Sequence, residues 1–222
     1  MWQALYQELA PRNFTVLAVA MDSRPDAPRP WIEAAQPGYP CLIDRDHYVA
    51  DLYHMVNVPQ AVWIDESGRI VRPTESAGAY EGFRAMDRAT RKVPEAVAKI
   101  TAAAKRTYAA AVRDWVLHGA RSEFAFDEAA ARAHVPLPTE ETVRAHAAFR
   151  LGQYLLRTGR GGEGDRYLAE AIRLHPDSWN LWRQRAEPNA LGLAAGPEFW
   201  ARVDALGERK YYAAVDMKGM PT

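Results

Sequence analysis

The feature that most constrains the fold is a series of short apolar segments, separated by turns, in residues 2–72. Residues 2–9 have apolar side chains at helical spacing, and residues 14–21 (FTVLAVAM) form a continuous apolar run typical of a strand buried on both faces. A strand at 41–43, a helix at 48–55 and strands at 61–65 and 69–72 are predicted next, with a turn at Gly68 between the last two. This order predicts an α/β unit that ends in an antiparallel hairpin.

Four pieces of this region resemble the second half of a thioredoxin-like domain of the TlpA/ResA thiol-disulfide oxidoreductase type: residues 39–44 (YPCLID), 52–53 (LY), 58–65 (VPQAVWID) and 68–71 (GRIV). The resemblance covers about residues 1–75 and implies a redoxin that acts on a protein or peptide disulfide without a cofactor. In that family the proline that matches Pro59 is cis and lies against the redox dithiol. The residue before it, here Val58, offers its backbone to an extended substrate. The resemblance thus implies a substrate-binding site at Asn57, Val58 and Pro59; a trans proline at the first position of a strand is the alternative.

Cys41 is the only cysteine of the chain, which excludes an internal disulfide and a Cys-x-x-Cys motif. Cys41 begins an apolar strand, where free cysteine acts as a small hydrophobic residue, so we expect it to be buried and unreactive. The segment 2–9 resembles the continuation of the family's first helix, which implies that the central strand and the redox motif belong upstream of Met1. No catalytic residue is therefore expected in this chain, and the chain itself is predicted to be inactive.

The resemblance also suggests why such a motif would be missing. Some bacterial ResA-like proteins with a helical extension carry Trp-Ala-x-Sec-Gly-Cys at this place, and a selenocysteine codon read as a stop would move the start of the chain to the next methionine. We therefore expect an N-terminally truncated redoxin whose missing residue is cysteine or selenocysteine. A relative that has no redox cysteine at all is the alternative.

Composition argues against several other functions. The chain has 28 basic and 28 acidic residues, so its net charge gives no reason to expect nucleic acid or an anionic membrane as partner. No apolar run approaches the ~20 residues of a membrane span. The six histidines are scattered and Asp44-x-Asp46 lacks the glycine and glutamate of a calcium loop, so no metal site is expected. The compartment stays unknown, with the cytoplasm favoured.

The second half of the chain has a helical pattern. A long Ala-rich helix is predicted at 94–118 and a shorter one at 122–134. Residues 145–176 resemble a tetratricopeptide repeat, in which small residues let two helices cross closely and large apolar residues fill the space between them. One repeat does not bury its own face, so we expect helices at 177–185 and 197–208 to cover it. The residues that carry the resemblance are Leu151, Gly152, Leu155, Gly159, Gly164, Leu168, Ala171 and Pro176.

The sequence therefore predicts a partial α/β thioredoxin-like domain at 1–79, without its first strand and redox motif, and an all-α helical domain at 80–222. Two functions stay open. The first is a thiol- or selenol-based oxidoreductase whose catalytic motif lies outside this chain. The second is a redox-inactive interaction module that binds a protein or peptide through its tetratricopeptide-like helices. Because the strands at 14–21 and 61–65 would lack a central partner, we also expect dimer formation through the open sheet edge.

Overall fold

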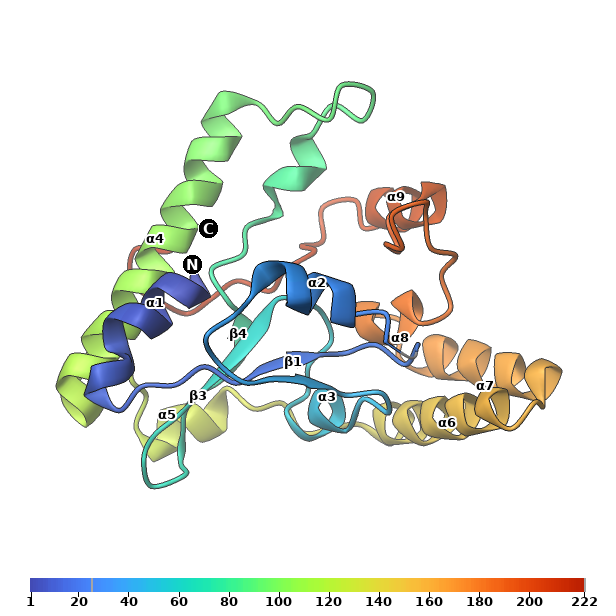
Figure 1. The fold of residues 1–222 in the computed structure, drawn as a ribbon, viewed down its shortest axis with the longest axis horizontal. Coiled ribbons are helices and arrows are strands. Elements are labelled where there is room, and N and C mark those ends of the chain that lie inside the picture. Colours follow the sequence, from blue (N-terminus) through green and yellow to red (C-terminus); the bar gives the residue numbers. More distant parts are fainter. Residues whose placement is uncertain (25, 222) are drawn as a thin grey trace. The chain divides into compact units, whose positions relative to one another are not determined.

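The computed structural model describes residues 1–24 and 26–221, and it divides the chain into two compact units. The first, the hairpin unit, consists of Met1–Val16, Pro59–Val135 and Ala201–Thr222, and the second, the helix-pair unit, consists of Leu17–Val58 and Pro136–Trp200. Along the chain, an N-terminal α/β region with two small sheets is followed by a largely helical region (Figure 1). The division into domains near residue 80 stays a prediction.

The hairpin unit is built around the antiparallel strands β3 (Gln60–Ile64) and β4 (Ile70–Ser76). Gly68 lies between them with a φ of 82°, a left-handed conformation that glycine adopts without strain. Trp63 on β3 packs with Tyr108 of the long helix α4 (Glu95–His118) and with Leu5 and Leu9 of α1 (Trp2–Leu9). The unit also contains η1 (Ala10–Arg12), η2 (Glu81–Ala85), η3 (Gly119–Arg121) and α5 (Glu128–Ala133).

The C-terminal tail, residues 205–221, packs onto the strands and helices of the hairpin unit. Met217 is 8 % exposed and belongs to the same core as Trp63. The Arg84 guanidinium donates to the carbonyl oxygens of Gly207 and Arg209, at 2.7 and 2.9 Å. Tail and hairpin therefore form one packed body, although more than a hundred residues separate them in the sequence.

The helix-pair unit combines a short parallel sheet with the predicted pair of crossing helices. In the sheet, β1 (Ala18–Ala20) pairs with β2 (Cys41–Ile43), and α2 (Arg29–Ala35) and α3 (Tyr48–Leu52) follow these strands. The pair consists of α6 (Glu140–Arg157) and α7 (Gly161–Leu174), and α8 (Trp179–Arg183) adds Leu181 to their core. The start of α9 (Pro197–Asp204) belongs to this unit as well.

Glycines set the close approach of α6 and α7. A Cβ atom on Gly152 would lie 2.9 Å from Leu168 and 3.0 Å from the carbonyl oxygen of Gly164, and one on Gly164 would lie 2.7 Å from Leu156. Such distances leave no room for a methyl group, which confirms the predicted role of these small residues. Leu155 and Leu168 are each 3 % exposed and fill the interface, also as predicted, whereas Leu151 is 40 % exposed. The prediction for Leu151 was wrong because its side of α6 does not face α7.

Several predicted elements are shorter in the structure. The strand predicted at 14–21 pairs only through Ala18, Val19 and Ala20, and these three residues are half-buried rather than buried on both faces. The three residues of β2 are its only partner in the described part of the chain, which explains both differences. The helix predicted at 48–55 ends at Leu52, since His54 has a positive φ of 54°. The helix predicted at 122–134 begins only at Glu128. The preceding residues form a turn, in which Ala125 donates its N–H to the Ser122 carbonyl, and Phe126 donates its N–H to the Val71 carbonyl.

Candidate functional site

The predicted substrate-binding residues lie where the chain passes from one unit to the other, between Val58 and Pro59. Asn57 is 3 % exposed, and its Oδ1 accepts a hydrogen bond from the Val58 N–H at 2.9 Å. The Val58 side chain is 40 % exposed, and the Pro59 carbonyl accepts from the Ala77 N–H at 3.2 Å. The role of these residues in substrate binding and the cis form of the Val58–Pro59 bond stay predictions.

Helix α8 holds the segment that precedes Pro59. The Val56 carbonyl accepts hydrogen bonds from the N–H groups of Trp179 and Asn180, at 2.7 and 3.1 Å. The Asn180 side chain donates to the Met55 carbonyl at 2.9 Å, and it is only 3 % exposed. The backbone of residues 55 and 56 is thus fixed by one short helix.

Arg183 extends this support to the candidate site itself. Both of its terminal nitrogens donate to Asn57 Oδ1 at 3.1 Å, and its guanidinium lies 5.9 Å from the ring centre of Trp179. Sequence analysis missed Asn180 and Arg183 because 126 residues separate Arg183 from Asn57, and no local pattern joins them. The only local signal was the expected helix at 177–185, whose N-terminus is capped by the Ser178 hydroxyl.

Cys41 does not have the surroundings of a nucleophile. It is half-buried rather than fully buried as expected, and its Sγ lies 3.8 Å from the Tyr39 carbonyl oxygen, which acts as its acceptor. A reactive thiol requires a neighbouring cation or a helix N-terminus that stabilises the thiolate. Cys41 instead stands at the first position of β2, paired with Ala18.

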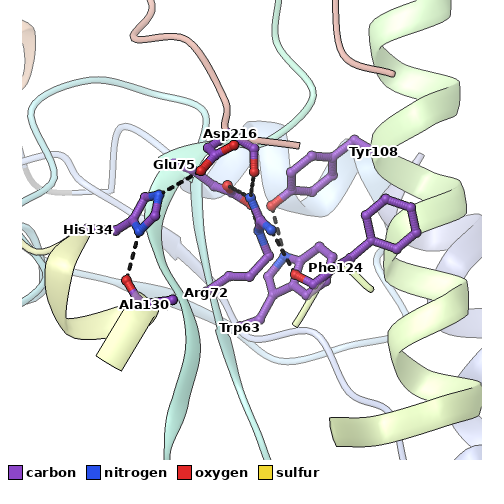
Figure 2. Close-up of polar contacts among 8 residues, drawn as sticks. All are labelled: Trp63, Arg72, Glu75, Tyr108, Phe124, Ala130, His134 and Asp216. Atoms are coloured by element: carbon purple, nitrogen blue, oxygen red, sulfur yellow. Dashed lines mark hydrogen bonds and ion pairs between the residues drawn. The ribbon is translucent and has the colours of Figure 1, made fainter. Parts of the chain in front are cut away.

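Arg72 forms the most deeply buried charged cluster of the hairpin unit (Figure 2). Its guanidinium binds the Glu75 carboxylate in a bidentate manner, at 2.8 and 2.7 Å, and donates at 2.7 Å to the carbonyl oxygens of Phe124 and Asp216. It also lies over the Phe126 ring, 4.3 Å from the centroid. Four donated hydrogen bonds satisfy nearly every N–H of this side chain. The cluster therefore ties β4 to the loop before α5 and to the C-terminal tail, and it leaves the guanidinium little capacity for a ligand.

The aromatic side chains of Trp63 and Tyr108 and the imidazole of His134 complete this cluster (Figure 2). Trp63 Nε1 donates to the Tyr108 hydroxyl at 2.8 Å. Burial, and next the negative charge of Glu75, hold the pKa of Tyr108 well above its ordinary value, so the phenol stays protonated. At the edge of the cluster, hydrogen bonds of His134 to the Ala130 carbonyl and then to Asp216 raise the pKa of the imidazole. These features describe a structural anchor rather than a catalytic centre.

The described part of the chain offers neither a metal cluster nor a membrane-spanning helix. Within residues 1–24 and 26–221, no group of three or more histidine, cysteine, aspartate or glutamate side chains could hold a metal ion. In that same span, none of the helices has the length and apolar character needed to cross a bilayer.

Comparison with known protein families gives a match for the N-terminal third of the chain. Residues 1–72 match the AhpC/TSA family. The matched residues are divided between the two units. Residues 1–16 and 59–72 lie in the hairpin unit, and residues 17–58 lie in the helix-pair unit. The helical region after residue 72 has no family assignment. Searches of the curated proteins and of the solved structures gave no significant match.

The AhpC/TSA match agrees with the thioredoxin-like resemblance of residues 1–75 at the level of the redoxin class, whose substrates are thiols in general. The finer assignments stay predictions: the TlpA/ResA type, the selenocysteine group and the tetratricopeptide-like repeat. The redoxin stretch holds a single cysteine, Cys41, so the match by itself does not establish a catalytic activity.

Proposed function

We propose that this chain is the substrate-recognition part of a thiol- or selenol-based oxidoreductase of the redoxin class, and that the redox-active residue lies outside these 222 residues. The observation that carries the proposal is the AhpC/TSA match over residues 1–72 in a chain whose one cysteine, Cys41, is half-buried at the start of β2. In this proposal the backbone of Val58, before Pro59, binds an extended protein or peptide disulfide. Neither a cofactor nor a metal takes part.

The contacts of α8 support a recognition role for the segment 55–59. A peptide-binding backbone has to be held in one conformation, because otherwise binding would include the entropic cost of ordering it. Asn180 and Arg183 hold this backbone in one conformation by donating hydrogen bonds to the Met55 carbonyl and to the Asn57 side chain, respectively. The helical extension would therefore position the redoxin's substrate site, as well as offering a surface of its own.

An insulin-reduction assay tests the proposal. The 222-residue chain is expected to show no turnover above the dithiothreitol background, because one cysteine does not cycle through an internal disulfide. Cys41→Ser is the matched control and should behave identically. Robust turnover that disappears in Cys41→Ser would overturn the assignment of Cys41 as unreactive.

A longer protein tests the location of the redox residue. The chain is extended upstream by roughly 40–60 residues, the amount that would bring the redoxin region to an ordinary domain size. If the added segment contains cysteine or selenocysteine, turnover should appear, and Asn180→Ala should then raise KM more than it lowers kcat. Absence of such a codon upstream, or an inactive extended protein, would contradict the proposal.

The alternative is a redox-inactive module that binds a protein or peptide through α6 and α7. The observation that favours it is the tight, glycine-mediated helix pair in a chain with a single cysteine. The extended protein separates the two functions, since the module would bind its partner equally well with or without the added residues and would show no turnover in either form.

A further inference from the structure

A cavity of about 260 Å³ lies beside the end of α8 and the beginning of α9. None of its lining residues belongs to the segment 55–59. All of its lining residues belong to the helix-pair unit, so its walls come from one compact body. Its volume suits a side chain or a small organic ion, since pockets for drug-sized ligands begin at about 300 Å³. The lining residues are Trp182, Ala186, Glu187, Ala194, Gly196, Pro197, Glu198 and Phe199.

Aromatic rings form the apolar walls of the cavity. Trp182 and Phe199 have ring centroids 6.3 Å apart, and Trp179 packs edge-on against both at 5.8 Å. This contact with Trp179 holds the two lining rings in place. The face of an aromatic ring carries a negative electrostatic potential, so a wall of this kind attracts cations, and indole does so most strongly.

Two carboxylates add negative charge at the same place. Glu187 and Glu198 both line the cavity and are exposed to solvent. Within the described residues neither carboxylate forms a hydrogen bond or an ion pair. Two arginines close in sequence, Arg183 and Arg185, do not line the cavity. Arg183 is engaged with Asn57 and the Trp179 ring.

We propose that this cavity binds an alkylammonium group, against the aromatic wall that Trp182 and Phe199 form and with Glu187 and Glu198 as counter-ions. The pattern of an aromatic wall and unpaired carboxylates suits a weakly hydrated cation, which is attracted both by the rings and by the full negative charges. It does not suit an anion, which the two carboxylates would repel, or a neutral apolar ligand, which would leave them unused. The proposal is independent of the redoxin function, because none of these residues belongs to the segment 55–59.

Choline is a suitable probe because its uncharged carbon isostere, dimethylbutanol, has the same shape. Binding is followed through the indole N–H resonance of Trp182 in two-dimensional NMR spectra, assigned with the Trp182→Phe variant. Choline should shift this resonance and saturate at millimolar concentration, whereas the isostere should bind about ten-fold more weakly. Equal binding of the isostere would overturn the proposal, since the cavity would then recognise shape alone.

Charge variants test the counter-ions. The double variant Glu187→Gln/Glu198→Gln should weaken choline binding about five-fold at low salt and reduce its salt dependence. The control Glu33→Gln/Glu141→Gln removes the same charge from exposed positions of the same unit and should leave binding unchanged. Unaltered binding in the first variant, or equal weakening in the control, would refute the assignment. A lysine peptide compared with free butylamine then shows whether the ammonium group comes from a protein side chain or from a free amine.

Discussion

His47 makes the stability of the helix-pair unit dependent on pH. The side chain is 0 % exposed, and neither ring nitrogen has a hydrogen-bond partner among the described residues. Its ring packs against Phe149 of α6, 4.6 Å between centroids. Burial, opposed by the charge of Asp44, lowers its pKa from 6.5 to about 4. Between pH 6.5 and about pH 4, His47 is therefore neutral in the folded chain and protonated in the unfolded chain.

The sign and magnitude follow from this difference in pKa. The stabilising contribution of neutral His47 is complete above pH 6.5 and is lost as the pH falls toward 4, since the unfolded state then binds the additional proton. Between pH 8 and pH 5 the loss amounts to about 2 kcal/mol of unfolding free energy. Asp44, Asp22 and Asp46 face the ring with negative charge and limit the loss, whereas His146 adds to it. Burial also lowers the pKa values of His146 and His175, so these two histidines likewise contribute less stability as the pH falls.

Urea unfolding at pH 8 and pH 5, followed by circular dichroism, measures the effect. His47→Asn suits the left-handed backbone at this position, where φ is 55°, and it removes the titrating ring. We expect the variant to lose about 2 kcal/mol less than the wild-type chain between the two pH values. His54→Asn is the matched control, because His54 has the same backbone conformation, with a φ of 54°, but is only half-buried. An unchanged pH dependence in His47→Asn, or the same reduction in His54→Asn, would refute the reasoning.

Two further predictions concern the packing of each unit. Arg72→Met removes the ion-pair partner of the Glu75 carboxylate, whose side chain is only 11 % exposed, and should destabilise the chain by about 3–5 kcal/mol in urea unfolding. Arg69→Met, on the same hairpin with a side chain 70 % exposed, should have little effect. Equal effects would contradict the buried-anchor interpretation. Gly152→Ala should cost about 1–3 kcal/mol, because its methyl group would lie 2.9 Å from Leu168. Gly162→Ala in α7 meets no atom within 4 Å and should be neutral or stabilising, and thermal unfolding of both variants provides the comparison.

Sequence analysis located the elements whose signals are local. Helix 2–9, the hairpin with its Gly68 turn and the α6–α7 pair with its glycine contacts are all found in the structure. In the structure the Thr139 hydroxyl caps α6 by accepting from the Thr142 N–H at 3.2 Å, which is an interaction between near neighbours in the sequence. Apolar periodicity, turn residues and caps act over a few neighbouring positions, so they can be interpreted without the tertiary structure.

Lengths and burial were less predictable where they depend on distant partners. Within the run 14–21, only the residues that pair with β2 form a strand. Leu151 is exposed because α6 and α7 cross on another side of α6. Pairing and helix crossing are interactions between segments, so a single apolar run does not reveal how much of it will find a partner.

The sequence by itself determined the similarity of residues 1–72 to the AhpC/TSA family, the presence of one cysteine and the helical nature of the region after residue 80. Only the tertiary structure decided which segments pack together: α8 with residues 55–57, and the tail with Arg72 of the hairpin. The physical reason is that buried polar groups must find partners wherever the fold places them. Arg72 finds its second carbonyl 144 residues away, at Asp216, a distance over which a sequence pattern carries no information.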